Sequence, residues 1–312
     1  MRLKMLFIGL MFSLVIHGQP EQDRKVRLDS LFQESYSDDN YKYFRICTDF
    51  YQKKDSHIIK DFYKSRNIFK EGIYEDNLAV HPLGEITTYH ENGYVASTTN
   101  YLKNRPVGKK ETWHENGNPK EVRIYETSDK GKTIFKIIDF WDISGKQLVV
   151  SGTGDYNSDN DDEKLNGKLV DSKWVGKLVG FSKKYNLIFT ENYENGVLIN
   201  GESIDVIGTI NKYTELESLP SVSGGIESFY RFIATKFRVP QMQGLNGKIY
   251  CQFMIKSNGQ LSDVKVIKGI SKEADQEAVR VVSLSSKWIP AHYRGIAVDC
   301  TYQLPISIRD SK

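Results

Sequence analysis

The segment Gly224–Phe237 reads GGIESFYRFIATKF, and it is followed closely by Val239-Pro240. Its apolar residues stand at positions 226, 229, 230, 233 and 237, which is the spacing of a helix with one buried face. The next segment, Lys248–Ile255 (KIYCQFMI), has the alternation of a strand. Ser257-Asn258-Gly259 supplies the positive φ angles of a tight hairpin turn, and a second strand returns through residues 261–267.

A second helix and a last strand complete this part of the chain. The helix is predicted to begin after Ser271, a suitable N-cap, and it places Ala274, Ala278, Val279 and Val282 on one face. Lys287-Trp288-Ile289-Pro290 then leads into a last strand over residues 296–308. The order α-β-β-α-β predicts a small α+β domain over residues 224–309.

Seven short motifs in this region stand in a fixed order. They are Gly224-Gly225, Asn246-Gly247-Lys248-Ile249-Tyr250, Ser257-Asn258-Gly259, the helix segment 277–282, Trp288-x-Pro290, Arg294-Gly295 and Leu304-Pro305-Ile306. Together they resemble the C-terminal domain of TonB, in the version attached to many secreted proteins of Bacteroidetes-type bacteria. The resemblance implies a protein-binding domain.

The resemblance also implies a binding site. In TonB the last strand of this domain captures an extended peptide of an outer-membrane transporter, which joins the sheet as an added strand. The matching edge here is Val298, Asp299, Cys300, Thr301, Tyr302, Gln303 and Leu304, with its backbone as the binding group. Alternation points Asp299, Thr301 and Gln303 away from the helices. The expected partner is a protein, with an outer-membrane TonB-dependent transporter as the candidate.

The chain has three cysteines, Cys47, Cys251 and Cys300. Alternation places Cys251 and Cys300 on the apolar face of their strands. Because the resemblance makes these two strands antiparallel neighbours, a disulfide between them is one alternative in an oxidising compartment. The other alternative is that both are small buried hydrophobic residues.

Residues 40–205 are self-similar. Tyr89-His90-Glu91-Asn92-Gly93 recurs twenty-four residues later as Trp113-His114-Glu115-Asn116-Gly117, and a glycine stands five residues before each aromatic. Weaker copies begin at Phe62, Phe140 and Tyr193. A fixed period with an Asn-Gly turn in each unit predicts an all-β array of stacked hairpins. The unit resembles the MORN-variant repeat.

No metal site, cofactor or catalytic centre is expected. His90 and His114 occupy the same place in successive units, which favours a structural role over a metal pair. An EF-hand loop beginning at Asp155 would need Gly at 160 and Glu at 166, where this chain has Asn160 and Asn166. The sequence also lacks a phosphate loop after a strand and a nucleophile elbow, so we expect a binding protein and not an enzyme.

The N-terminus is typical of a secretory signal peptide over residues 1–18, with a basic head, an apolar run at 5–16 and a small residue before a polar stretch. The rival interpretation is an uncleaved anchor, because Ser13 and His17 resemble the Ser/His pair in the anchor helix of TonB. Twelve apolar residues cover only ~18 Å of a ~30 Å hydrocarbon core, which favours cleavage. We therefore expect an exported, periplasmic or envelope-associated protein.

The remaining segments are expected to connect these parts. Residues 19–39 are predicted to be a polar, partly helical lead-in, and residues 206–223 a linker. Residues 224–309 hold 12 Lys/Arg against 6 Asp/Glu, whereas residues 19–223 carry a net charge of −5. An acidic body and export argue against a nucleic-acid partner.

Two classes of function remain open. The first is an energy transducer that serves transport across the outer membrane, and the second is an exported scaffold with two protein-binding modules. TonB has Gln-Pro where this chain has Lys236-Phe237, and this sequence shows no Pro-rich rod long enough to span the periplasm. Contact with an inner-membrane motor is therefore not expected.

Overall fold

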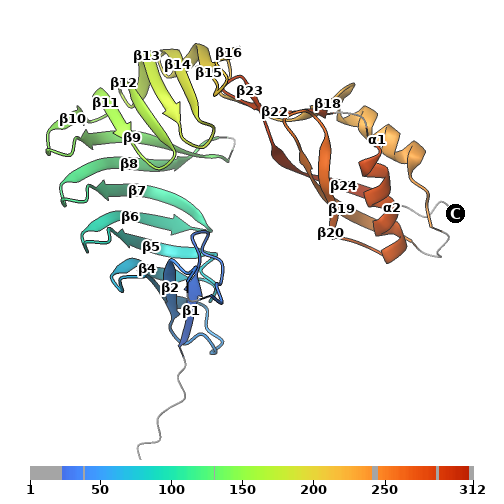
Figure 1. Cartoon of the computed structure of the whole chain (residues 1–312), viewed down its shortest axis with the longest axis horizontal. Coiled ribbons are helices and arrows are strands. Elements are labelled where there is room, and N and C mark those ends of the chain that lie inside the picture. Colours follow the sequence, from blue (N-terminus) through green and yellow to red (C-terminus); the bar gives the residue numbers. More distant parts are fainter. Residues whose placement is uncertain (1–22, 38, 130, 241–244, 286–287, 309–312) are drawn as a thin grey trace, which may run out of the picture. The chain divides into compact units, whose positions relative to one another are not determined.

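The computed structural model describes residues 23–37, 39–129, 131–240, 245–285 and 288–308. The chain divides into two compact units, Met1–Val150 and Ser151–Lys312. Strands dominate both units, and the two helices of the described residues lie in the second (Figure 1). The predicted architecture, hairpins followed by a small α+β domain, is confirmed. The predicted signal peptide lies outside the described residues.

The first unit is a meander in which each strand pairs antiparallel with the next. Its strands are β1 (Arg24–Leu28), β2 (Tyr43–Cys47), β3 (His57–Tyr63), β4 (Ile68–Tyr74), β5 (Pro82–Tyr89), β6 (Val95–Leu102), β7 (Arg105–Trp113), β8 (Pro119–Thr127), β9 (Thr133–Trp141) and β10 (Gln147–Val150).

The repeated turns explain the period seen in the sequence. Each Asn-Gly turn closes a hairpin with its glycine at positive φ, 91° at Gly93 and 83° at Gly117. The asparagine before each glycine donates to a backbone carbonyl of the next turn: Asn92 Nδ2 to Glu115 O at 2.7 Å, and Asn116 Nδ2 to Ile143 O at 2.8 Å. The turns are thus stacked by side-chain bonds as well as by the strand ladder.

The histidines of the repeat belong to the same stack. His90 Nε2 donates to the Trp113 carbonyl at 2.9 Å, and His114 Nε2 donates to the Trp141 carbonyl at 3.0 Å. Each ring therefore joins one turn to the next in the way that the asparagines do. Their equal spacing in the sequence follows from this repeated contact.

The predicted lead-in is corrected by the structure. The expectation of partial helix over residues 19–39 is wrong for its described part, because Arg24–Leu28 forms strand β1, paired with β2. Its side chains alternate between the two faces, and Leu28 is buried. Period-2 alternation is the pattern of a strand. Strand β1 therefore extends the antiparallel ladder to residues before 40.

The second unit begins with another meander in which each strand pairs antiparallel with the next. Its strands are β11 (Thr153–Asp159), β12 (Glu163–Val170), β13 (Lys173–Ser182), β14 (Leu187–Glu194), β15 (Val197–Ile204) and β16 (Ile210–Tyr213). The segment that begins at Asp155, considered above as an EF-hand loop, is the β11–β12 hairpin, where Asp159 pairs with Lys164 and Lys183.

The predicted linker, residues 206–223, is largely structured. The Asp205 carboxylate accepts from the amides of Ile207 and Thr209, which makes a hairpin turn and lets β16 extend the ladder to Tyr213. Two further short strands, β17 (Glu217–Ser218) and β18 (Ser221–Val222), pair with strands of the C-terminal domain. Eight of these eighteen residues therefore lie in strands, and the segment is not the unstructured linker that the sequence predicted.

The C-terminal domain has the predicted order of main elements. These are α1 (Gly225–Lys236), β19 (Gly247–Ile255), β20 (Leu261–Lys268), α2 (Lys272–Ser283), β21 (Trp288–Ile289), β22 (Ala291–Tyr293), β23 (Ile296–Val298) and β24 (Cys300–Ile308). Ser271 caps α2 as expected, its Oγ accepting from Ala274 N at 3.2 Å. The main sheet has the order β20-β19-β24.

The core of this domain lies between the two helices and one face of the sheet. Phe229 and Ile233 of α1, Val281 of α2 and Phe253 of β19 are buried in one cluster with Trp288, whose ring contacts those of Phe229 and Phe253. Two residues of the predicted apolar stripe on α1, Ile226 and Tyr230, are instead 39% and 38% exposed. The helix therefore buries a narrower face than its sequence indicated.

Candidate functional site

The outer edge of β24 is the candidate site. The strand pairs with β19 in an unbroken register from Gly247 opposite Ile308 to Ile255 opposite Cys300. No other described strand pairs with β24. Unpaired N–H and C=O groups in regular order along a strand form a template for another strand.

The composition of β24 leaves this edge unobstructed. Residues 300–308 read CTYQLPISI and contain no charged side chain. The opposite edge strand, β20, is protected: its pairing with β19 shifts register twice, Asp263 has a φ of 55°, and it carries Lys265 and Lys268. Bulges and lysines are the usual devices that prevent an edge from pairing. Of the two edges, β24 is the one open to strand addition.

Pro305 fixes which backbone groups face outward. Proline has no N–H, so it is accommodated in an edge strand only where its nitrogen faces away from the ladder. In a strand, the N–H and C=O of one residue point toward the same neighbouring strand, and those of the next residue point in the opposite direction. Every second residue therefore presents its N–H to the same edge. Because Pro305 pairs with Tyr250 in a regular ladder, Thr301, Gln303 and Ser307 direct their amides to the open edge. Their side chains are exposed.

The predicted edge, residues 298–304, is corrected at both ends. Val298 belongs to β23, where it pairs with Ala291 of β22 and not with β19. Asp299 lies between the strands, where its carboxylate pairs with Lys256 and accepts from Ser257 N at 2.7 Å. The chain therefore changes sheets at Asp299, so the predicted single strand over 296–308 is broken there. The edge begins at Cys300 and continues to Ile308.

A groove borders the C-terminal half of this edge. It has a volume of about 380 Å³ and lies between α1 and β24. Tyr230, Ala234 and Phe237 of α1 and Ile306 and Ile308 of β24 are among its lining residues. The exposure of Tyr230 thus has a structural context, since its ring forms part of a mostly apolar wall. No motif in the sequence predicted this groove.

The strand register decides between the two alternatives for the cysteines. Cys251 lies opposite Leu304, and Cys300 lies opposite Ile255, so the two are offset by four residues along their strands. At about 3.4 Å per residue this separation exceeds the ~7 Å limit of a disulfide. The alternative of a Cys251–Cys300 disulfide is therefore wrong, and all three thiols are free. Cys251 is buried, as the other alternative predicts, and burial raises the pKa of its thiol to about 11. Cys300 is only partly buried, so that alternative holds fully for Cys251 alone.

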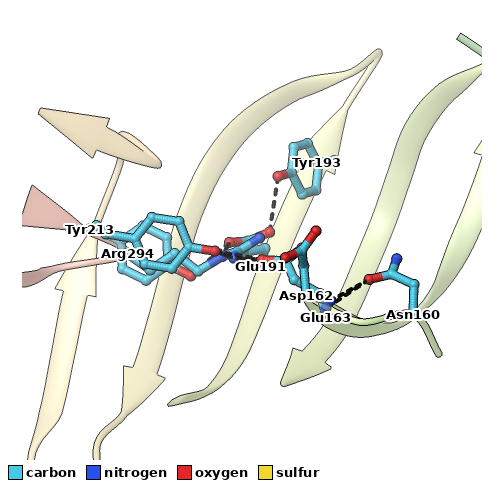
Figure 2. A network of polar contacts seen from close by, with 8 residues as sticks. Asn160, Asp162, Glu163, Glu191, Tyr193, Tyr213 and Arg294 are labelled. Atoms are coloured by element: carbon cyan, nitrogen blue, oxygen red, sulfur yellow. Dashed lines mark hydrogen bonds and ion pairs between the residues drawn. The ribbon is translucent and has the colours of Figure 1, made fainter. Parts of the chain in front are cut away.

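A network around Arg294 joins this domain to the preceding ladder within the second unit (Figure 2). Arg294 stands at the turn of the β22–β23 hairpin with a φ of 47°. Its Nε donates to Glu191 Oε1 of β14 at 2.7 Å, and its Nη1 pairs with Glu163 of β12. The guanidinium lies over the Phe189 ring, 3.6 Å from the centroid.

The carboxylate of Glu191 is fully buried and has three partners. Besides Arg294, it accepts from Tyr213 Oη at 2.8 Å and from Tyr193 Oη at 2.9 Å. Burial opposes the charge of Arg294, but the carboxylates of Glu191 and Glu163 outweigh it and hold its pKa above the ordinary value. The backbone of Arg294 is also held, since its N–H donates to Leu216 O and its carbonyl accepts from Ser203 Oγ, both at 2.7 Å.

An unpaired edge strand beside a groove is an arrangement suited to binding another extended chain. The described residues contain no cluster of three or more His, Cys, Asp or Glu side chains arranged to hold a metal. Nor does any described helix have the length and apolar character needed to cross a membrane.

Residues 238–308 match the family model described as the C-terminal domain of the Gram-negative bacterial TonB protein. The expected TonB-type domain is thereby confirmed for this segment, and the family is a non-enzymatic, transport-associated protein-interaction domain. The match covers less than a quarter of the chain and begins after α1. A search of curated proteins found no match to the chain.

Proposed function

We propose that the chain is an exported protein that captures an extended peptide of a partner as an added strand on β24, in support of energy-coupled transport across the outer membrane. The observation that carries the proposal is the regular, uncharged and unpaired edge of β24 with outward amides at Thr301, Gln303 and Ser307. Hydrogen bonds from the partner's backbone to this edge would supply affinity, and the adjacent groove would supply specificity for the partner's side chains.

The partner that fits this site best is an outer-membrane TonB-dependent transporter. Its contact segment would have to be extended and free of proline at the positions that donate to β24. A side chain on the helix side of such a segment would lie next to the groove formed by Tyr230 and Phe237. An apolar residue at that position would bury surface without leaving a polar group unpaired.

The alternative is an exported scaffold that does not transmit work. The repeat array, resembling MORN-variant repeats, would then bind one partner while β24 binds another. The Arg294 network supports either role, because it joins the β24 domain to the strands before it. The two roles differ in what happens at the N-terminus: a transducer keeps a membrane anchor, whereas a scaffold is processed.

The test of strand capture uses the full chain and short synthetic peptides from the periplasm-facing segments of transporters encoded in the same genome. Amide hydrogen exchange is followed with and without peptide. Strand addition predicts that Thr301, Gln303 and Ser307 gain protection, while amides of β20 do not. Binding that leaves these three amides unprotected would place the peptide elsewhere and overturn the proposal.

The cellular role is tested separately by fractionation and N-terminal sequencing. An intact N-terminus in the membrane fraction would support the transducer. A mature chain that starts near Gln19 and is absent from the membrane fraction would support the scaffold.

A further inference from the structure

A second, larger groove lies in the first unit. It has a volume of about 1020 Å³, which is at the upper end of the range for ligand sites. Its walls come from β1, the segment that follows β1, strand β2 and the β3–β4 turn. No motif in the sequence predicted it, and it is independent of the edge of β24.

The groove is basic in a part of the chain that is otherwise acidic. Arg24, Lys25, Arg27, Lys64 and Arg66 line it, against two carboxylates. Both carboxylates already have partners. One, from Glu34, binds Arg24 at 2.7 and 2.8 Å, and the other, from Asp23, accepts from Asp49 N at 3.0 Å. Residues 67–223 carry 18 Lys/Arg against 24 Asp/Glu, so this surplus of positive charge is local.

Aromatic rings lie among these cations. The ring of Tyr41 has Arg27 at 5.4 Å and Lys64 at 4.7 Å from its centroid, so one tyrosine is flanked by two positive groups. Tyr36 and Tyr51, which also line the groove, are 93% and 73% exposed. Large, exposed rings beside a basic surface are typical of a binding surface.

The spacing of the cations on β1 indicates the shape of the ligand. Lys25 and Arg27 are both exposed and stand two residues apart on one face of the strand, at about 6.6–6.8 Å. In an extended peptide, the side chains on one face also recur every second residue, at the same interval of about 6.6–6.8 Å. We propose that this groove binds an extended acidic peptide whose carboxylates stand at alternate positions. Lys64 and Arg66 of the β3–β4 turn, which also line the groove, would supply further positive charge to the same peptide.

The test measures binding of a labelled peptide of alternating Glu and Ser to the full chain by fluorescence anisotropy at low salt. Arg27→Glu/Lys64→Glu should weaken binding at least tenfold. Lys168→Glu/Lys177→Glu, which makes the same charge change on exposed positions of β12 and β13, should leave it within about twofold. Arg27→Gln/Lys64→Gln, which neutralises the two positive charges without reversing them, should also weaken binding. Unfolding midpoints confirm that each variant is folded.

Salt and a second polyanion complete the test. Raising the ionic strength from about 0.01 M to about 0.15 M shortens the Debye length from ~30 to ~8 Å and should weaken binding strongly. Tyr41→Ala should weaken it too, whereas Tyr94→Ala, an exposed tyrosine outside the groove, should not. Equal loss with the Lys168/Lys177 control, or binding of alginate but not of the acidic peptide, would overturn the proposal.

Discussion

Arg294 and Glu191 are 103 positions apart in the sequence, yet their side chains meet at 2.7 Å with both groups nearly or fully buried. The pair ties the β22–β23 hairpin to β14. Since the same hairpin leads through Asp299 into β24, the candidate binding strand is connected by a short path to the ladder. The network therefore sets where the open edge lies relative to β12–β16.

Replacing Arg294 by Met should destabilise the protein strongly, because it leaves the Glu191 carboxylate buried without its cation. A loss of about 3–5 kcal/mol in the free energy of unfolding is expected. Urea unfolding of the full chain measures it. Lys256→Met, which breaks the exposed pair with Asp299, is the matched control and should cost no more than about 1 kcal/mol. Equal effects of the two substitutions would contradict the role given to Arg294.

Each asparagine of the repeated turns should make its own contribution to the free energy of unfolding. Asn92→Ala and Asn116→Ala each remove the bond to the next turn and the Oδ1 acceptor of their own turn, which binds Tyr94 N or Asn118 N. At about 0.5–1.5 kcal/mol for each bond, each variant should lose about 1–3 kcal/mol of stability. Asn157→Ala, on an exposed strand position, should cost less. Thermal unfolding followed by far-UV circular dichroism measures all three. Turn variants as stable as the Asn157 control would show that the side-chain bonds of these asparagines, within and between turns, do not stabilise the array.

The thiol of Cys251 should be unreactive in the native state. Its pKa of about 11, raised from 9.0 by burial, keeps it protonated. Because the thiol ionises at lower pH in the unfolded chain than in the folded one, this group lowers stability as pH rises from about 9 to 11. Alkylation before and after urea, each with and without reductant, tests these points. A mass that changes with reductant would contradict the free thiols.

The sequence was most informative where local signals agree with the tertiary structure. Ser271 as a cap, the Asn258-Gly259 turn and the alternation in β19 each depend on a few neighbouring residues, and each prediction is confirmed. The repeated Asn-Gly turns likewise gave the hairpin array. The prediction of partial helix in residues 19–39 was wrong because the alternation in β1 covers only five residues, and the polar composition around them outweighed it in the prediction.

The edge of the binding strand was harder to predict, because it depends on pairing between distant segments. Resemblance placed the edge at residues 298–304, but the strand changes partner at Asp299, where Lys256 and Ser257 hold the carboxylate. Pro305 was a usable signal, since a proline in an otherwise regular strand indicates an open edge. The Arg294 network had no local signal, since it joins residues more than 100 positions apart.

The central claim, that β24 binds a partner strand through its outward amides, is tested most directly by proline substitution. Thr301→Pro and Gln303→Pro each delete an outward donor, whereas Thr301→Ala and Gln303→Ala keep it and change only the side chain. Binding of the transporter-derived peptide to the full chain is measured for all four, with melting temperatures alongside. The account predicts that each proline variant stays folded and loses about 1–2 kcal/mol of binding, roughly five- to thirtyfold in affinity, while the alanine variants bind nearly as the wild type. Folded proline variants that bind the peptide with undiminished affinity would contradict it.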